Sequence, residues 1–339
     1  MRKIIAILLL FTCVFSFAQI TQEITHNGIK RSFIYYTPTT WAESESMPLL
    51  IVLHGLTQDG KGIMDFSGFN DIAEENNFVV CYPDGLNRAW NANMNVSISQ
   101  ADDIGFIEEI TLIMQKKLNT NPSKQYLCGI SNGGFMSHKL ACESGQCFAG
   151  IATIAGTMSD TVFQNCNPTY TNNILHIHGT ADAIVNYNGS STTGVSVDQL
   201  MKKWRSYLNC DLNPQKEDMP NTNRLDLSYP ERYTYTNCKN GTLEHIKIIG
   251  GGHQWPGIIG LLGGVGAINM DFYSPQLIWD FLKDKSCNQT SSINELKVNE
   301  TKLIIQVTDL LGRKVNINSN TPLLYFYGDG SVERKFHLN

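Results

Sequence analysis

Short apolar stretches recur along residues 48–249 and alternate with longer stretches in which apolar residues lie three or four positions apart. A short continuous apolar run is typical of a strand buried on both faces, and the longer spacing is typical of an amphipathic helix. This alternation predicts an α/β fold with a mostly parallel central sheet and helices on both faces. Strands are predicted near residues 48–53, 78–82, 124–128, 148–154, 173–178 and 244–249, and helices near residues 62–76, 103–118, 132–143, 195–208 and 274–284.

The pattern changes at both ends of this region. Before it, alternating residues on either side of Asn27-Gly28 predict a β-hairpin over residues 22–36. After it, polar residues 287–292 predict a linker, and alternating segments near residues 303–315 and 322–335 predict a small all-β module over residues 293–339. The alternative for these late strands is that they extend the main sheet.

Residues 1–18 have the pattern of a secretory signal peptide. Two basic residues precede an apolar run over residues 4–17, and the segment ends in Ser16-Phe17-Ala18. A run of this length is too short to span a membrane as a helix. Lipidation at Cys13 is the alternative. The α/β domain is therefore expected over residues 19–286.

Charge and composition narrow the possible functions. The formal net charge is −5 and the charged residues are interspersed, so no basic patch indicates a nucleic acid partner. The sequence contains no Cys-x-x-Cys motif and no histidine cluster at ligand spacing, so we expect no metal and no cofactor. We expect a secreted monomer.

The cysteines indicate disulfides. The chain has nine cysteines, and the eight that follow Cys13 are an even number in a chain expected to be exported. Cys210 and Cys238 flank a polar, proline-containing stretch and form the preferred pair. Pairing of Cys147 with Cys166, or of Cys142 with Cys147, is the alternative set. Cys81 and Cys128 lie in apolar strands and are expected to be buried free thiols.

The most informative motif is Gly129-Ile130-Ser131-Asn132-Gly133, which follows an apolar strand and precedes a helical pattern. Glycines around a serine allow a sharp strand-to-helix turn that exposes the hydroxyl group. A serine is a poor nucleophile unless a base removes its proton and an acid orients that base. Ser131 is therefore a candidate nucleophile.

Asp182 and His253 are the candidate acid and base. Asp182 follows the predicted strand 173–178, and His253 follows the predicted strand 244–249 and three glycines. Both lie at the carboxyl ends of strands, where open α/β sheets build their sites. The chain order of serine, acid and histidine is that of the Gly-x-Ser-x-Gly hydrolases. We expect an oxyanion hole formed by the backbone N–H of Asn132 and that of Leu56 or Thr57.

These segments together resemble the polyhydroxybutyrate depolymerase-like group, which includes feruloyl and acetylxylan esterases of the first carbohydrate-esterase family. The resemblance runs from about residue 25 to about residue 285 and implies an α/β-hydrolase fold, with Ser131 as nucleophile, Asp182 as acid and His253 as base. Leu56 replaces a cysteine that many relatives carry, and Asn186 replaces a proline. The motifs are Leu53-His54-Gly55, Tyr82-Pro83-Asp84-Gly85, Trp90-Asn91, Asp102-Asp103-Ile104-Gly105-Phe106, Gly129–Gly134, His178-Gly179-Thr180-Ala181-Asp182 and Gly252–Gly257.

The substrate contacts are less determined by the sequence. Trp255 is expected to form a wall of the acyl site, and Trp90 and Tyr187 to contact substrate from loops at the same edge; a buried structural role is the alternative. The apolar, glycine-rich segment 257–266 is expected to be a mobile rim or a packed loop. His54, His176, His178 and His245 are interpreted as structural histidines.

We expect a secreted serine carboxylesterase that acts through an acyl-enzyme on feruloyl or acetyl esters of plant polysaccharides, or on a polyhydroxyalkanoate polyester. A secreted serine peptidase and a non-catalytic surface binding protein are the alternatives. The tail resembles the C-terminal sorting domain of type IX secretion cargo, which implies the secretion machinery as a partner.

Overall fold

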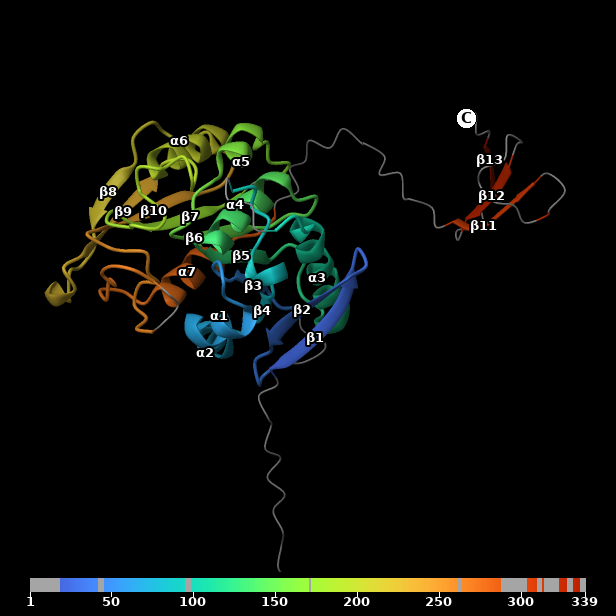
Figure 1. Cartoon of the computed structure of the whole chain (residues 1–339), viewed down its shortest axis with the longest axis horizontal. Coiled ribbons are helices and arrows are strands. Elements are labelled where there is room, and N and C mark those ends of the chain that lie inside the picture. Colours follow the sequence, from blue (N-terminus) through green and yellow to red (C-terminus); the bar gives the residue numbers. More distant parts are fainter. Residues whose placement is uncertain are drawn as a thin grey trace, which may run out of the picture. The chain divides into compact units, whose positions relative to one another are not determined.

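In the computed structural model, a ten-stranded sheet forms the centre of residues 20–249 and carries helices on both faces (Figure 1). Its strand order is β1-β2-β4-β3-β5-β6-β7-β10-β9-β8. The six inner strands are parallel: β3 (Leu49–Leu53), β4 (Val79–Pro83), β5 (Gln125–Ile130), β6 (Gly150–Ile154), β7 (Ile174–Gly179) and β10 (Leu243–Ile249). Their carboxyl ends therefore meet at one edge of the sheet.

Antiparallel strand pairs lie at the two ends of the strand order. The expected hairpin is present as β1 (Ile20–His26) and β2 (Ile29–Tyr36), and β2 pairs with β4. On the other side, β9 (Tyr229–Tyr235) pairs with β10 and with β8 (Gln215–Asp218). The sequence pattern missed β8 and β9 because every β8 residue is exposed and polar and because Pro230 interrupts β9.

Each face of the sheet has its own core, because alternate strand residues point to opposite faces. The first core contains Ile51 and Leu127 from the sheet, packed with Phe106, Leu140 and Trp204 from the helices. Four helices cover this face: α3 (Asp103–Leu118), α4 (Asn132–Glu143), α5 (Asp160–Asn165) and α6 (Val197–Leu208).

The second core lies on the opposite face and contains Leu50, Val80 and Tyr126. Three helices cover it: α1 (Gly60–Ser67), α2 (Phe69–Asn76) and α7 (Ser274–Leu282). Two short 3-10 helices, Leu86–Arg88 and Arg224–Asp226, lie in loops. The parallel strands are thus buried on both sides, as their continuous apolar runs predict.

The single helix expected over residues 62–76 is two helices, because the chain turns at Gly68. Gly68 has a φ of 71°, a left-handed conformation that glycine adopts without a Cβ clash, and it ends α1 and begins α2. The other expected helices are present, and α3 and α4 have the predicted bounds. The α/β-hydrolase fold expected from the sequence is confirmed.

The structure describes residues 19–41, 46–94, 99–170, 172–260, 264–287, 304–309, 313, 323–327 and 332–335. The expected signal peptide, the alternative lipidation site Cys13 and residues 288–292 of the expected linker lie outside these ranges. The chain divides into two compact units, residues 1–288 and residues 289–339. In the second unit, β11 (Ile304–Asp309), β12 (Leu323–Tyr327) and β13 (Val332–Lys335) form a separate antiparallel sheet.

Three disulfides cross-link the first unit. Cys210 bonds to Cys238, as expected, and Cys81 and Cys128 are buried free thiols. Both alternatives for Cys147 are wrong, because Cys147 bonds to Cys287 and Cys142 bonds to Cys166. Cys287, the expected first residue of the linker, is thereby held on the core, and its backbone N–H donates to the carbonyl of Ser123 at 2.8 Å.

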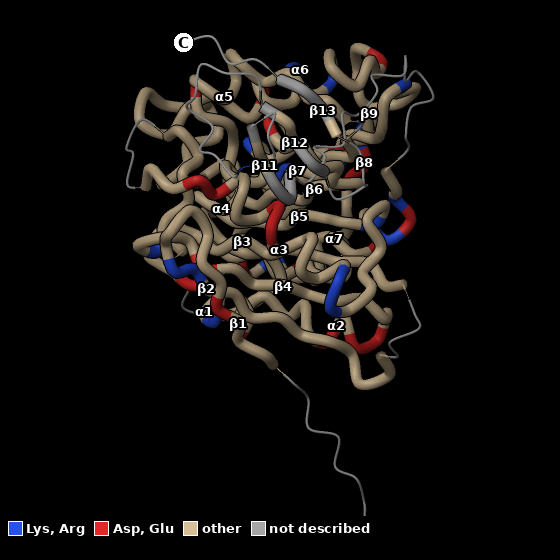
Figure 2. Tube along the Cα trace, turned by 90° about the vertical axis from the view of Figure 1, so that its right-hand side faces the viewer, with Lys and Arg blue, Asp and Glu red and all other residues tan. Residues whose placement is uncertain are grey.

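Basic and acidic residues are interspersed over the first unit (Figure 2). No helix in the described ranges is long and apolar enough to cross a membrane. Within the same ranges, no cluster of three or more histidine, cysteine or acidic residues has the arrangement of a metal site.

Candidate active site

Ser131 occupies a strained turn between β5 and α4. Its backbone has φ 54° and ψ −123°, and its N–H donates to the carbonyl of Ile154 at 2.9 Å. A Cβ on Gly129 would collide with the carbonyl of Gly133, and a Cβ on Gly133 would collide with that of Leu53. Glycine at both positions therefore allows the tight turn, which directs the serine away from the sheet.

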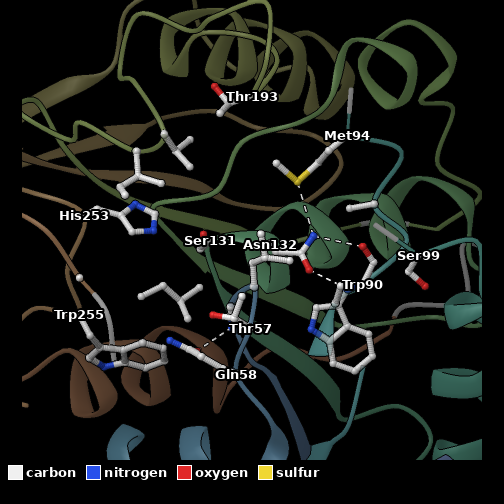
Figure 3. A pocket seen from close by; sticks show the side chains of 18 of the residues that line it. Thr57, Gln58, Trp90, Met94, Ser99, Ser131, Asn132, Thr193, His253 and Trp255 are labelled. Atoms are coloured by element: carbon white, nitrogen blue, oxygen red, sulfur yellow. Dashed lines mark hydrogen bonds between the residues drawn. The ribbon is translucent and has the colours of Figure 1, made fainter. Parts of the chain in front are cut away.

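His253 and Asp182 form a buried hydrogen bond beside this turn. The Nδ1 atom of His253 lies 2.8 Å from Oδ2 of Asp182. His253 and Asp182 are only 7% and 3% exposed, so little water competes for this bond. Because the carboxylate accepts at Nδ1, the neutral imidazole has its Nε2 lone pair free to accept a proton. Figure 3 shows His253 and Ser131 at the same cavity.

The backbone of His253 is held by the segment expected to be a rim. His253 and Val265 form an antiparallel bridge, in which each backbone N–H donates to the carbonyl of the other residue, at 2.7 Å and 3.2 Å. The N–H of Gly252 donates to the carbonyl of Ala267 at 2.9 Å. Val265, in the described part of segment 257–266, is thus paired with the histidine loop. Residues 261–263 lie outside the described ranges.

Asp182 is held as a carboxylate by four donors. Its Oδ1 accepts from the backbone N–H groups of Ile184 and Val185, at 2.9 Å and 2.8 Å. Its Oδ2 lies near His253 and, at 3.3 Å, near Nε2 of His178. Burial acts to raise the pKa of Asp182, but the hydrogen bonds from His178 and His253 outweigh burial and hold the pKa below its usual range.

A cavity of about 400 Å³ opens above Ser131 and His253. Its apolar lining residues include Phe66, Ile184 and Val185, and residues with amide or hydroxyl side chains line it as well. Those polar residues include Gln58, Asn91, Asn93, Ser99, Thr192, Thr193 and Gln254. The sequence predicts no cavity role for these residues: Asn91 and Gln254 lie in the motifs that carry the resemblance, and the other five lie in loops outside those motifs.

Of the three candidate donors for the oxyanion hole, two remain. The backbone N–H of Thr57 donates to the carbonyl of Arg88 at 2.8 Å, so Thr57 is not available as a donor in this conformation. Leu56 and Asn132 line the cavity beside Ser131. Asn132 is the first residue of α4, where the helix dipole favours negative charge. The backbone N–H groups of Leu56 and Asn132 are therefore the candidate pair.

Trp90 joins the two sides of this candidate hole. Its backbone N–H donates to Oδ1 of Asn132 at 2.7 Å, and its carbonyl accepts from Nδ2 of Asn132 at 3.1 Å (Figure 3). Its indole N–H donates to the carbonyl of His54 at 2.9 Å, in the loop that carries Leu56. Trp90 is 2% exposed, so it lines the cavity mainly as a buried connection between two loops.

Trp255 and Tyr187 differ in their relation to the cavity. Trp255 is among the lining residues but is 1% exposed, and its ring contacts Phe66 and Phe69 edge-on. Tyr187 is not among the described residues that line the cavity. Its hydroxyl lies 2.9 Å from Nε2 of His245 on β10. The structure therefore places Tyr187 in a buried hydrogen bond to His245, outside the lining of this cavity.

His54 has the structural role expected for it. The backbone N–H of Gly85 donates to its Nε2 at 2.9 Å, so the ring proton lies on Nδ1 and donates to the carbonyl of Gly55 at 2.7 Å. Burial lowers the pKa of His54, which keeps the ring neutral. The histidine connects the oxyanion loop to the loop that follows β4.

A serine on a strand-to-helix elbow, with a histidine and an acid after later strands of the same parallel sheet, defines the α/β-hydrolase class. The chain belongs to the "Putative esterase" family, whose model matches residues 25–245. The finding agrees with the carboxylesterase class expected from the motifs.

Individual relatives are distant. The chain is 27% identical over 229 residues to the bifunctional acetylxylan esterase/xylanase of Neocallimastix patriciarum, a match that covers 67% of this chain and 31% of the relative. It is 26% identical over 238 residues to feruloyl esterase B of Piromyces equi, covering 66% and 42%. The chain thus spans less than half the length of these two relatives.

A solved structure supports the fold. The acetyl xylan esterase from Aspergillus awamori superposes with a TM-score of 0.55 at 15% identity, and the match covers 78% of this chain and 99% of that chain. At this identity the similarity shows the shared fold.

Proposed function

We propose that this chain is a secreted serine carboxylesterase that uses Ser131, His253 and Asp182. The observation that carries the proposal is the buried hydrogen bond of 2.8 Å between His253 and Asp182 at the cavity that contains Ser131. A binding protein would have no need for an oriented base beside a strained serine, so this pair argues against the non-catalytic alternative.

The reaction has two steps. Oγ of Ser131 attacks the ester carbonyl carbon while its proton passes to Nε2 of His253, and the N–H groups of Leu56 and Asn132 stabilise the resulting oxyanion. The C–O bond to the alcohol then breaks, the alcohol takes the proton from His253, and an acyl-enzyme remains. Water attacks the acyl-enzyme through the same base, which releases the acid and restores Ser131.

The cavity has the size and the lining residues for an ester that is larger than a simple acetate. Its apolar lining residues fit an acyl group, and its amide and hydroxyl residues fit the hydroxyl groups of a sugar. Relatives named for feruloyl and acetylxylan ester hydrolysis support the same substrates. We therefore infer a feruloyl or acetyl ester on a plant polysaccharide, with a polyhydroxyalkanoate polyester as the second substrate to test.

Export is part of the proposal. Three disulfides support an oxidising compartment outside the cytoplasm. The signal-like segment 1–18 and the separate three-stranded sheet of the second unit support a cleaved leader and a sorting module read by a type IX secretion system.

The direct test is hydrolysis of p-nitrophenyl acetate, methyl ferulate, acetylated xylan and polyhydroxybutyrate by the full chain and by two variants. Ser131→Ala is expected to lose activity by on the order of 10³-fold or more, and Asp182→Asn by on the order of 10⁴-fold because the histidine tautomer is wrong. Circular dichroism checks that both variants are folded. A Ser131→Ala protein with more than about a tenth of the activity would disprove the assignment.

A further inference from the structure

A chain of buried polar side chains runs from α6 to the candidate catalytic acid. It begins at Trp204, whose indole nitrogen lies 3.2 Å from Nδ1 of His138 on α4. Nε2 of His138 lies 3.1 Å from the hydroxyl of Thr153 on β6, which lies 2.8 Å from Nδ1 of His176 on β7. The site chemistry described above uses none of these groups.

The chain continues to Asp182 through a second histidine of β7. Nε2 of His176 lies 3.2 Å from Nδ1 of His178. Nε2 of His178 lies 2.8 Å from the carbonyl of Val185 and 3.3 Å from Oδ2 of Asp182. All five side chains of this chain are 1% exposed or less, so water does not replace any of these bonds: Trp204, His138, Thr153, His176 and His178.

The direction of donation along these hydrogen bonds is fixed at both ends of the series of side chains. An indole N–H only donates, so His138 accepts at Nδ1 and carries its proton on Nε2. A backbone carbonyl only accepts, so His178 carries its proton on Nε2 and accepts at Nδ1. Both constraints agree when Thr153 accepts from His138 and donates to His176. Every proton then points toward Asp182.

The rings of His138 and His176 are neutral, as this direction requires. Burial lowers the pKa of His138 to about 3, and burial, followed by the neighbouring His178, His245 and His138, lowers the pKa of His176 well below its usual value. A neutral imidazole has one donor and one acceptor, so a single tautomer serves each ring.

We propose that His178 is a positioning residue for Asp182, and that the chain from Trp204 through Thr153 keeps the His178 proton on the nitrogen that faces the carboxylate. His178 also bonds to the carbonyl of Val185, whose N–H holds the other carboxylate oxygen at 2.8 Å. The His178 ring therefore holds both the Asp182 carboxylate and the backbone of Val185, which is itself hydrogen-bonded to that carboxylate. This inference rests on the proposed esterase function.

The test compares variants that keep or remove single donors, assayed with p-nitrophenyl acetate on the full chain. His178→Phe keeps a ring but removes the donor, and kcat is expected to fall by roughly 10- to 100-fold with KM changed by less than about twofold. His178→Gln places an amide N–H near the former Nε2 position and is expected to restore most of kcat.

A second pair of variants, at Thr153, tests the hydrogen-bonded series of side chains at a point distant from the carboxylate. Thr153→Val removes the hydroxyl at nearly constant shape and is expected to lower kcat by roughly 3- to 10-fold, whereas Thr153→Ser keeps the hydroxyl and stays within about twofold of the wild type. Thr111→Val is the matched control, because Thr111 is a buried threonine on α3 whose hydroxyl donates to the carbonyl of Glu108. Its kcat is expected to be unchanged.

The outcomes separate this inference from the proposed function. If the wild type hydrolyses esters and Ser131→Ala does not, while His178→Phe keeps kcat within about twofold, the positioning role is wrong. Equal losses in Thr153→Val and Thr153→Ser would also overturn it, and this pair decides the matter if His178→Phe does not fold. A wild type that hydrolyses none of the four esters would instead contradict the proposed function.

Discussion

Trp90 connects the two segments that carry the candidate oxyanion donors. Its indole N–H bonds to the loop of Leu56, and its backbone bonds twice to the side chain of Asn132. The two candidate oxyanion donors belong to different elements, so their separation depends on this connection. Displacement of one oxyanion donor typically lowers kcat by about 10²- to 10³-fold.

We therefore expect Trp90→Phe to lower kcat by roughly tenfold or more with a smaller change in KM, because the bond to His54 is lost while most of the packing remains. Steady-state kinetics with p-nitrophenyl acetate measure the effect. Trp279→Phe is the control, because the indole N–H of Trp279 has no partner among the described residues and its ring stacks on Phe78 in the second core. Equal kcat values for the two variants would contradict this role.

At the scale of single residues, the sequence predicts groups that follow strands. Ser131, Asp182 and His253 each follow a parallel strand, and the structure places Ser131 and His253 at one cavity with Asp182 bonded to His253. The roles of Trp90 and Tyr187 could not be predicted, because they depend on bonds to backbone groups and to a histidine distant in the sequence.

At the scale of elements, a buried ion pair connects the hairpin, α3 and the cavity loop. Oδ1 of Asp103 lies 2.7 Å from Nη2 of Arg31 on β2, and its Oδ2 accepts from the backbone N–H of Asn91 at 2.7 Å. Nζ of Lys139 on α4 donates to the carbonyl of Asn91 at 2.8 Å. The loop of Asn91, which lines the cavity, is therefore held from two helices.

Asp103→Ala is expected to lower the free energy of unfolding by about 3–5 kcal/mol, because it leaves the Arg31 guanidinium buried without its partner. It is also expected to raise KM, since Asn91 loses an acceptor. Urea denaturation measures the first effect and ester kinetics the second. The double variant Arg31→Met with Asp103→Leu removes both charges and should regain much of the stability. A loss below about 1 kcal/mol in Asp103→Ala would contradict the prediction.

The periodicity of the sequence predicts the parallel strands and their helices because these elements bury continuous apolar surface. It fails where tertiary contacts replace that signal. Gly68 divides one apparent helix into two, and β8 forms from exposed polar residues because β9 offers an edge with which it can pair. Neither the turn at Gly68 nor the pairing of β8 with β9 can be read from the apolar periodicity.

At the scale of the whole molecule, buried neutral histidines make stability depend on pH. Burial lowers the pKa of His138 and of His245 from 6.5 to about 3. Between these pH values the unfolded chain binds protons that the folded chain does not, so the free energy of unfolding rises with pH across this window. Each such ring contributes about 1.4 kcal/mol per pH unit.

The midpoint of urea denaturation is therefore expected to fall steeply as the pH drops from about 6.5 toward 3. His245→Asn keeps a hydrogen-bonding side chain but removes the titrating group, so its midpoint should depend less on pH. An unchanged slope in His245→Asn would contradict the explanation.

The disulfide between Cys147 and Cys287 attaches Cys287, the expected first residue of the linker, to the first unit. A chain of residues 19–287 is expected to fold and to hydrolyse p-nitrophenyl acetate at nearly the full rate. A chain of residues 19–285 lacks Cys287, loses a cross-link across a sequence separation of 140, and is expected to be less stable by about 2–5 kcal/mol. Thermal denaturation of both chains measures the difference. An inactive 19–287 chain would show that the second unit is needed for catalysis.

The same disulfide determines where residue 287 lies on the first unit. The backbone of Cys287 is hydrogen-bonded to Ser123, just before β5 begins, whereas Ser131 lies just after β5 ends. The six residues of β5 separate these two points by roughly 20 Å along the strand. Cys287 therefore lies at the edge of the sheet where the parallel strands begin, opposite the edge that carries the cavity.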